Sequence, residues 1–108
     1  MDKAEKQKIL AELTHFSEEG YDEIFSMLLE HTAEKIKELR AAVEKDDFLS
    51  IAKIAHSLKG TSGSLRVAAL YESAKSIEAV ARENPDRQKI IDDIVRLENA
   101  LAQLKIVE

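Results

Sequence analysis

The chain has 108 residues, no cysteine and a formal net charge of −5, with 34% charged residues. This length suits one domain, and the lack of cysteine excludes a disulfide framework and a thiolate metal site. The same lack favours a reducing compartment, so we expect a cytoplasmic protein. The negative charge argues against nucleic-acid binding, and no apolar run is long enough for membrane insertion.

Apolar residues recur every three or four positions along most of the chain, a spacing that predicts helices. In chain order the expected helices cover about 3–16, 22–45, 47–64, 67–82 and 85–105. Asp46 is the predicted N-cap of the third helix. Asn84 and Pro85 are the predicted N-cap and first residue of the fifth.

Short connections make successive helices antiparallel neighbours. We therefore expect an all-α protein, an antiparallel up-and-down four-helix bundle with a shorter N-terminal helix across one end. Residues 1–108 form one domain, with the N-terminal helix in 1–17 and the bundle in 21–105. With one core, the protein is expected to be a monomer. The second helix should bury an apolar stripe of Ile24, Phe25, Leu28, Ile36, Leu39 and Val43.

The acidic residues are unevenly distributed. All 21 of them lie outside the 24 residues from Phe48 to Tyr71, a stretch that contains Lys53, Lys59 and Arg66. Burial of one helix face explains missing acids only on that face. The pattern therefore predicts a basic patch on an acidic protein, suited to an anion or an acidic partner surface.

His56 lies in this stretch, on the third helix. At 100° per residue it is roughly 160° from both Ile54 and Leu58, so it is expected to face away from the core. Side chains on a helix lean toward its N-terminus, so a side chain at position 60 would cover His56. Gly60 leaves the imidazole accessible. Ala52 and Gly63 are small residues, so no large side chain projects from the same face beside it.

An accessible imidazole on a convex helix suits a large partner better than a small ligand in a pocket. Such a group can act as a nucleophile. A phosphoryl group on it would bring about two negative charges, and Lys59, one turn further on, is placed to donate a charge-assisted hydrogen bond to it.

The segment "AHSLKGTSGSL", from Ala55 to Leu65, resembles the signature of histidine-containing phosphotransfer (HPt) domains. The resemblance extends over about residues 21–104. It implies that His56 accepts a phosphoryl group, that Lys59 stabilises it and that Gly60 gives access. The implied docking face for a receiver domain consists of Ala52, Lys53, Ser57, Gly60, Gly63 and Arg66.

The resemblance also implies the partners, which are a response-regulator receiver domain, a sensor histidine kinase or both. No cofactor is expected in this chain, because the receiver supplies the Mg²⁺. No metal site is expected either, since no two of His15, His31 and His56 have the one-turn spacing of a helical metal site. The family usually has glycine where this chain has Arg66, so we expect a turn of different shape there.

Two other functions fit the same residues. One is a helical adaptor that docks a signalling partner through the His56 face without phosphotransfer. The other is a small enzyme with His56 as its base, which the sequence disfavours because no carboxylate is evident that would orient the imidazole. Nothing in the sequence resembles a phosphate-binding glycine loop, so we expect a phosphoryl carrier and not an autonomous kinase.

Overall fold

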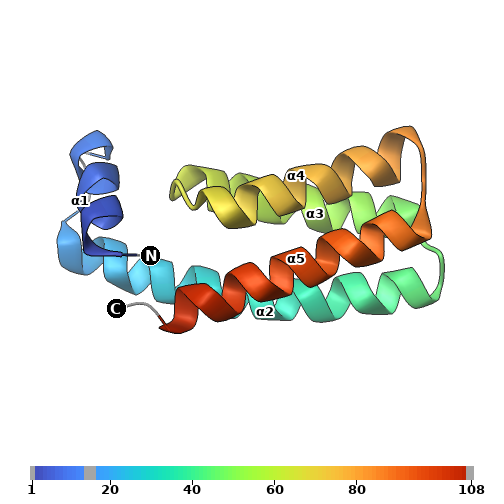
Figure 1. Cartoon of the computed structure of the whole chain (residues 1–108), viewed down its shortest axis with the longest axis horizontal. Coiled ribbons are helices and arrows are strands. Elements are labelled where there is room, and N and C mark those ends of the chain that lie inside the picture. Colours follow the sequence, from blue (N-terminus) through green and yellow to red (C-terminus); the bar gives the residue numbers. More distant parts are fainter. Residues whose placement is uncertain (1, 14–16, 107–108) are drawn as a thin grey trace.

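The computed structural model describes residues 2–13 and 17–106. Within these ranges it contains five helices and no strand, and the helices are α1 (Lys3–Glu12), α2 (Glu18–Glu44), α3 (Phe48–Ser64), α4 (Ala68–Glu83) and α5 (Arg87–Ile106). Helices α2 and α4 each pack against both α3 and α5. The predicted four-helix bundle is thus confirmed, and α1 lies across the end where α2 begins and α5 ends (Figure 1).

The core consists of the apolar stripes of the four long helices. It is continuous across α3 and α4, where Ile51, Ala55, Leu58, Leu70, Ala74 and Ile77 are fully buried. The prediction that Ile24 belongs to the core is wrong, because 37% of the surface of this residue is exposed on α2. Among the residues that the structure describes, no helix combines the length and apolar character needed to cross a bilayer.

Serine or aspartate caps three of the four long helices, α2, α3 and α5, but not always at the predicted positions, and Val67 at the start of α4 makes no side-chain cap hydrogen bond. Ser17 caps α2 by accepting a hydrogen bond from the Gly20 N–H, so this helix begins four residues before its expected start. Asp47, and not Asp46, accepts from the Ser50 N–H at the start of α3. Asp86 caps α5 by accepting from the Lys89 N–H.

Residues near these starts have other roles. Asn84 is the C-cap of α4, since its N–H donates to the carbonyl of Val80, and Pro85 precedes the true cap of α5. Asp46 has φ 50° and ends α2 in the left-handed conformation. Aspartate tolerates that conformation better than most residues, which is why it stands at this end of a helix instead of at the next beginning.

The turn from α3 to α4 brings these two helices into an antiparallel pair. The Arg66 N–H donates to the carbonyl of Gly63 at 3.1 Å, and the Val67 N–H donates to that of Ser62 at 2.9 Å. This pair of bonds is the Schellman motif, whose central residue is usually glycine. Arg66 itself has φ 59°, so the backbone adopts the conformation that glycine favours, and arginine does not change the turn as the sequence suggested.

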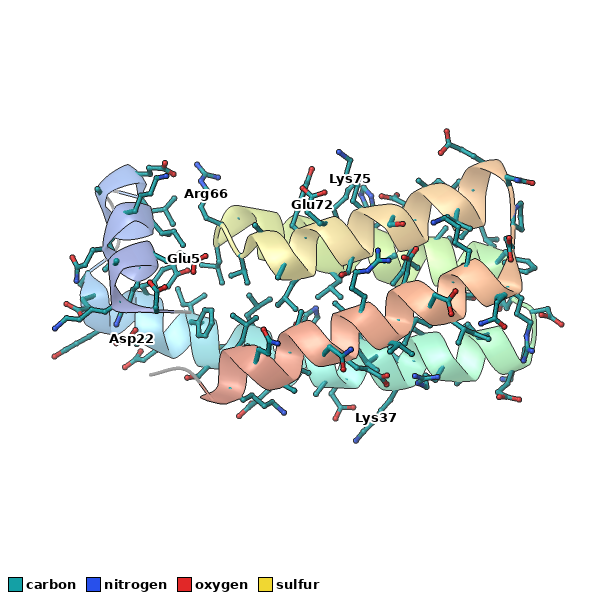
Figure 2. The ribbon with its side chains drawn as sticks, in the orientation of Figure 1. Glu5, Asp22, Lys37, Arg66, Glu72 and Lys75 are labelled. Atoms are coloured by element: carbon teal, nitrogen blue, oxygen red, sulfur yellow. The ribbon has the colours of Figure 1, made fainter. Side chains whose placement is uncertain are left out.

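Two contacts fix the turn to the rest of the molecule. The hydroxyl of the buried Tyr21 on α2 donates to the carbonyl of Leu65 at 2.8 Å. The Nε atom of Arg66 lies 3.5 Å from Glu12 Oε2 on α1. Figure 2 shows the Arg66 side chain at the α1 end of the α3–α4 pair. The α1 helix is further held by the burial of Ile9 and by an ion pair from Lys6 to Asp22 at 2.6 Å.

Replacing Arg66 with glycine is expected to stabilise the fold. A non-glycine residue in the left-handed region costs roughly 1–2 kcal/mol, which exceeds the contribution of the exposed ion pair with Glu12. Chemical denaturation should therefore show a free energy of unfolding that is higher by about 1 kcal/mol in Arg66→Gly. Arg66→Ala removes the ion pair but keeps the strain, so an equal gain in both variants would contradict this explanation.

Candidate functional site

His56 lies in the middle of α3 with 65% of its side chain exposed. The expected exposure is confirmed, but the imidazole does not point directly away from the core. The buried residues of α3 centre on Ala55 and Ser62, and Ile54 is only partly buried. The His56 side chain therefore lies on the edge of α3 that faces α4.

A carboxylate from α4 meets the imidazole at this edge. Glu78 follows Ile77, which is fully buried, and its side chain lies against α3 with 10% exposure. Its Oε2 atom is 2.9 Å from His56 Nδ1, and its Oε1 atom is 2.6 Å from Lys59 Nζ. Arg82 Nε, one turn later on α4, donates to the same Oε2 at 3.0 Å.

The charge of Glu78 follows from these contacts. Burial raises the pKa of the Glu78 carboxyl, but hydrogen bonds from Lys59, Arg82 and His56 outweigh it and lower the pKa to about 2. Glu78 is therefore ionised at neutral pH, and an ionised carboxylate only accepts hydrogen bonds. The proton of a neutral His56 must then be on Nδ1, which leaves the lone pair on Nε2.

This arrangement corrects two expectations from the sequence. A carboxylate does orient the imidazole, and the patch around His56 is not purely basic. Glu78 is 22 residues from His56 in sequence and lies outside the acid-free stretch. The only available signal was its position next to the core residue Ile77 on the helix after the histidine.

Lys59, expected to donate a hydrogen bond to a phosphoryl group, already has an anionic partner. In the structure its ammonium group is bound to Glu78, and its side chain is 29% exposed. Lys59 and His56 thus contact the two oxygens of one carboxylate.

The predicted docking residues differ in exposure, and Gly63 is partly buried. Lys53, Ser57, Gly60 and Arg66 are exposed. Ala52 is only 2% exposed, so it is not part of an accessible face. It adjoins Ile51 and lies one turn from Ala55 within the buried arc of α3, which is wider than the sequence pattern suggested.

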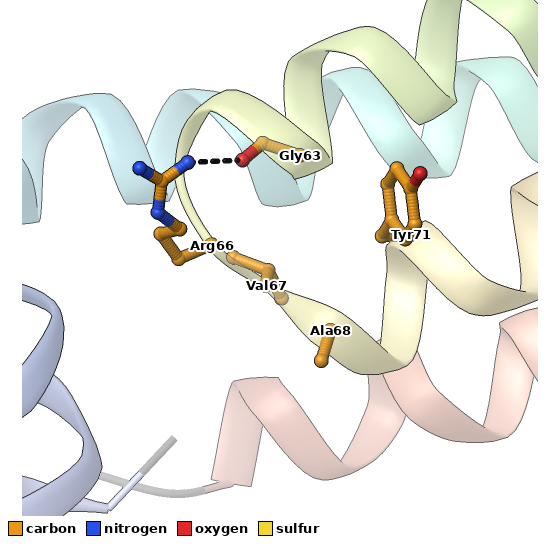
Figure 3. Close-up of a pocket in the computed structure, with 5 residues that line it drawn as sticks. All are labelled: Gly63, Arg66, Val67, Ala68 and Tyr71. Atoms are coloured by element: carbon orange, nitrogen blue, oxygen red, sulfur yellow. Dashed lines mark hydrogen bonds between the residues drawn. The ribbon is translucent and has the colours of Figure 1, made fainter.

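The two glycines of α3 have different surroundings. A Cβ atom built on Gly60 meets no atom within 4 Å, consistent with the prediction that this position is kept open. A Cβ atom on Gly63 would lie 3.1 Å from the Tyr71 ring. Gly63 therefore allows close packing of α3 against α4, and with Arg66 and Tyr71 it lines a pocket of about 380 Å³ (Figure 3).

On the other side of α3, an apolar pocket lies between α3 and α2. This pocket has a volume of about 230 Å³ and is lined by Ile24, Met27, Leu28, His31, Thr61 and Leu65. Met27 is 66% exposed. The exposed face of α3 thus extends from the His56–Glu78 contact on its α4 side to an apolar surface on its α2 side. Sequence reasoning missed this surface because Ile24 fits the core stripe of α2.

The other histidines have no comparable environment. His31 is partly buried, and its Nε2 has no hydrogen-bond partner within the described parts of the chain. His15 lies outside the described residues. Among residues 2–13 and 17–106, no three histidine, cysteine or acidic side chains are grouped as metal ligands.

The fold and the site define a class of protein, a helical bundle that presents one oriented imidazole on a convex face. A family model described as "Hpt domain" matches residues 23–106. The chain therefore belongs to the Hpt domain family, the histidine-containing phosphotransfer modules of two-component signalling, which interact with receiver domains and histidine kinases. Comparisons with curated proteins and with solved structures gave no significant match. Helix α1 lies outside the matched residues.

Substitutions at Gly60 test whether this glycine serves access. Gly60→Ala should raise the free energy of unfolding by up to about 1 kcal/mol, because alanine favours the helix and its Cβ meets open space. Gly60→Gln should keep the fold but slow phosphoryl transfer, measured as the rate of adduct formation.

Gly63→Ala is the matched control for stability, since its Cβ must displace the Tyr71 ring. It should gain less stability than Gly60→Ala, or lose some. If Gly60→Gln unfolds the domain or transfers at the wild-type rate, Gly60 is not there for access.

Replacing Glu78 with glutamine tests the control of the histidine proton. A glutamine amide can accept from Nδ1–H or donate to Nδ1, so the preference for one tautomer should weaken. Nitrogen NMR of the imidazole at pH 8 should show Nδ1–H in the wild type and a mixture of tautomers in Glu78→Gln. Glu72→Gln, an exposed change on the same helix, should match the wild type (Figure 2).

The same variant has an expected pH dependence. The folded pKa of Glu78 lies below its usual value of 4.5, so its ionisation stabilises the fold above that value. This contribution is lost as the pH falls from about 4.5 to about 2. The stability deficit of Glu78→Gln should therefore be full at pH 6 and shrink below pH 4.5, and a deficit that does not change with pH would contradict the ionised state.

Proposed function

We propose that this chain carries a phosphoryl group on Nε2 of His56, either between the aspartates of two receiver domains or from a histidine kinase to a receiver. The observation that supports it best is the contact of His56 Nδ1 with the ionised Glu78 at 2.9 Å. That contact holds the proton on Nδ1 and directs the nucleophilic lone pair of an exposed imidazole to Nε2.

Transfer from a receiver is then a single displacement. The Nε2 lone pair attacks the phosphorus of the receiver's aspartyl phosphate, and the N–P bond forms as the P–O bond to the aspartate breaks. The bonding electrons leave with the receiver's carboxylate. The proton stays on Nδ1, so the ring becomes cationic, and Glu78 stabilises that charge through the existing hydrogen bond. The reverse step delivers the group to a second receiver.

Lys59 is the residue that we assign to the phosphoryl group itself. Its ammonium is held at 2.6 Å from Glu78 Oε1, on the same carboxylate that contacts the histidine. A flexible lysine can turn from one anion to a neighbouring one with little rearrangement of the helix. The doubly negative phosphoryl group is a stronger attractant than the carboxylate.

The docking face that we propose for the receiver extends beyond the histidine motif. It includes the exposed Lys53, Ser57, Gly60 and Arg66 along α3 and the turn that follows it. On the α2 side it includes the exposed Met27 and the apolar pocket beside it. An apolar centre with charged residues around it is the usual composition of protein interfaces.

The proposal also covers the cofactor, the cellular location and the oligomeric state of the chain. The chain itself needs no cofactor, because the Mg²⁺ of the reaction belongs to the receiver. We place the chain in the cytoplasm, where kinases and receivers of such relays meet. It acts as a monomer, since its four long helices bury their apolar stripes against one another.

Intact-mass analysis after incubation with a phosphorylated receiver domain or a small phosphoramidate donor tests the proposal. The wild type should gain one acid-labile phosphoryl adduct. His56→Gln should gain none, while His31→Gln, a control at another histidine, should still gain one. An absence of adduct on the wild type with several donors would favour the adaptor, which docks partners through this face without phosphotransfer.

A further inference from the structure

The Glu78 carboxylate binds two cations, although one would neutralise it. Lys59 Nζ lies 2.6 Å from Oε1, and Arg82 Nε lies 3.0 Å from Oε2. The two cations come from different helices. Lys59 is on α3, one turn after His56, whereas Arg82 is on α4, four residues after Glu78.

This difference in origin gives the cations different mobility. A lysine carries a compact charge on a flexible side chain. Once His56 is phosphorylated, Lys59 can bind the phosphoryl group in place of Glu78. An arginine one turn from a glutamate on the same helix is its neighbour through the helix itself, and this spacing does not depend on groups on α3. Arg82 Nε also shares the Oε2 atom that accepts the His56 Nδ1 proton, so it constrains the oxygen that orients the ring.

The charges around the site favour a second cationic side chain at Glu78. Before transfer, Glu78 carries one negative charge beside two positive ones. The phosphoryl group adds about two negative charges, which Lys59 is placed to balance. If Lys59 were the only cationic side chain at Glu78, its departure would leave this carboxylate, only 10% exposed, with the His56 imidazolium as its one positive partner beside a new doubly negative group. A mostly buried carboxylate whose charge is poorly compensated raises the free energy of the phosphorylated protein.

We propose that Arg82 is a positioning residue that keeps Glu78 charged and aligned with His56 while Lys59 moves from Glu78 to the phosphoryl group. This inference rests on the proposed function, because it concerns the phosphorylated state. Arg82 does not touch the phosphoryl group. It acts through Glu78, and it allows one lysine to leave the carboxylate without loss of the hydrogen bond to Nδ1.

The test compares variants in their equilibrium with a phosphorylated receiver domain, with the phosphorylated fraction measured by intact mass. The ratio of phosphorylated to free chain should fall about fivefold in Arg82→Gln, because Lys59 must then serve two anions. Arg82→Lys keeps a cation one turn from Glu78 and should recover most of the loss. Arg40→Gln is the matched control, since Arg40 is a similarly exposed arginine paired with a glutamate elsewhere, and it should match the wild type.

The double variant distinguishes positioning from direct contact. If Arg82 acts by releasing Lys59, the variant with both Lys59→Gln and Arg82→Gln should lose little more than Lys59→Gln alone. If Arg82 binds the phosphoryl group itself, the two losses should multiply, which would overturn the inference. In the unphosphorylated state, nitrogen NMR should show that Arg82→Gln keeps the Nδ1–H tautomer, because Lys59 still holds Glu78.

The outcomes separate this inference from the function on which it rests. A wild type that takes no phosphoryl group overturns the proposed function and the role of Arg82 with it. A wild type that is phosphorylated, with Arg82→Gln equal to Arg40→Gln, overturns the role of Arg82 alone.

Discussion

The site depends on the ionised carboxylate of Glu78, which reaches from α4 to the imidazole on α3. Its three donors are His56, Lys59 and Arg82, and they lie 2.6–3.0 Å from its oxygens. One carboxylate thereby sets the tautomer of the histidine, holds the nearest lysine and connects the two helices. The chemistry of His56 is for this reason a property of the α3–α4 pair and not of the histidine motif alone.

Much of the fold could be predicted from the sequence, because helical periodicity records burial directly. Most of the stripe expected on α2 is buried, including Leu28, Leu39 and Val43, and five helices were expected in this order. The errors occur where periodicity carries no information. Asp46 and Asp47 are neighbours with the same side chain, and only the backbone conformation decides which one caps a helix. Ile24 has the three- to four-residue spacing of the core positions, but it lies at the edge of the buried face of α2, where it is exposed.

The candidate site could be predicted only in part. His56, Lys59 and Gly60 are recognisable because they lie within one turn of each other on a single helix, where sequence spacing determines geometry. Glu78 and Arg82 come from the next helix. The contact of Glu78 with α3 depends on the rotation and height of α4 in the bundle, which follow from the packing of the whole core. Ala52 shows the same limit, because its burial reflects how closely a neighbouring helix approaches.

The contact between Gly63 and Tyr71 has a mechanical consequence for the site. It lies next to the turn that joins α3 and α4, at the closed end of the pair, where a Cβ atom would be only 3.1 Å from the ring. His56 and Glu78 lie further from the turn. A larger side chain at position 63 would act as a wedge near the pivot, and a small opening of the angle there would become a longer gap between the imidazole and its carboxylate. The missing Cβ atom of one glycine thus lets α3 and α4 pack closely near the turn, two turns from the hydrogen bond between His56 and Glu78.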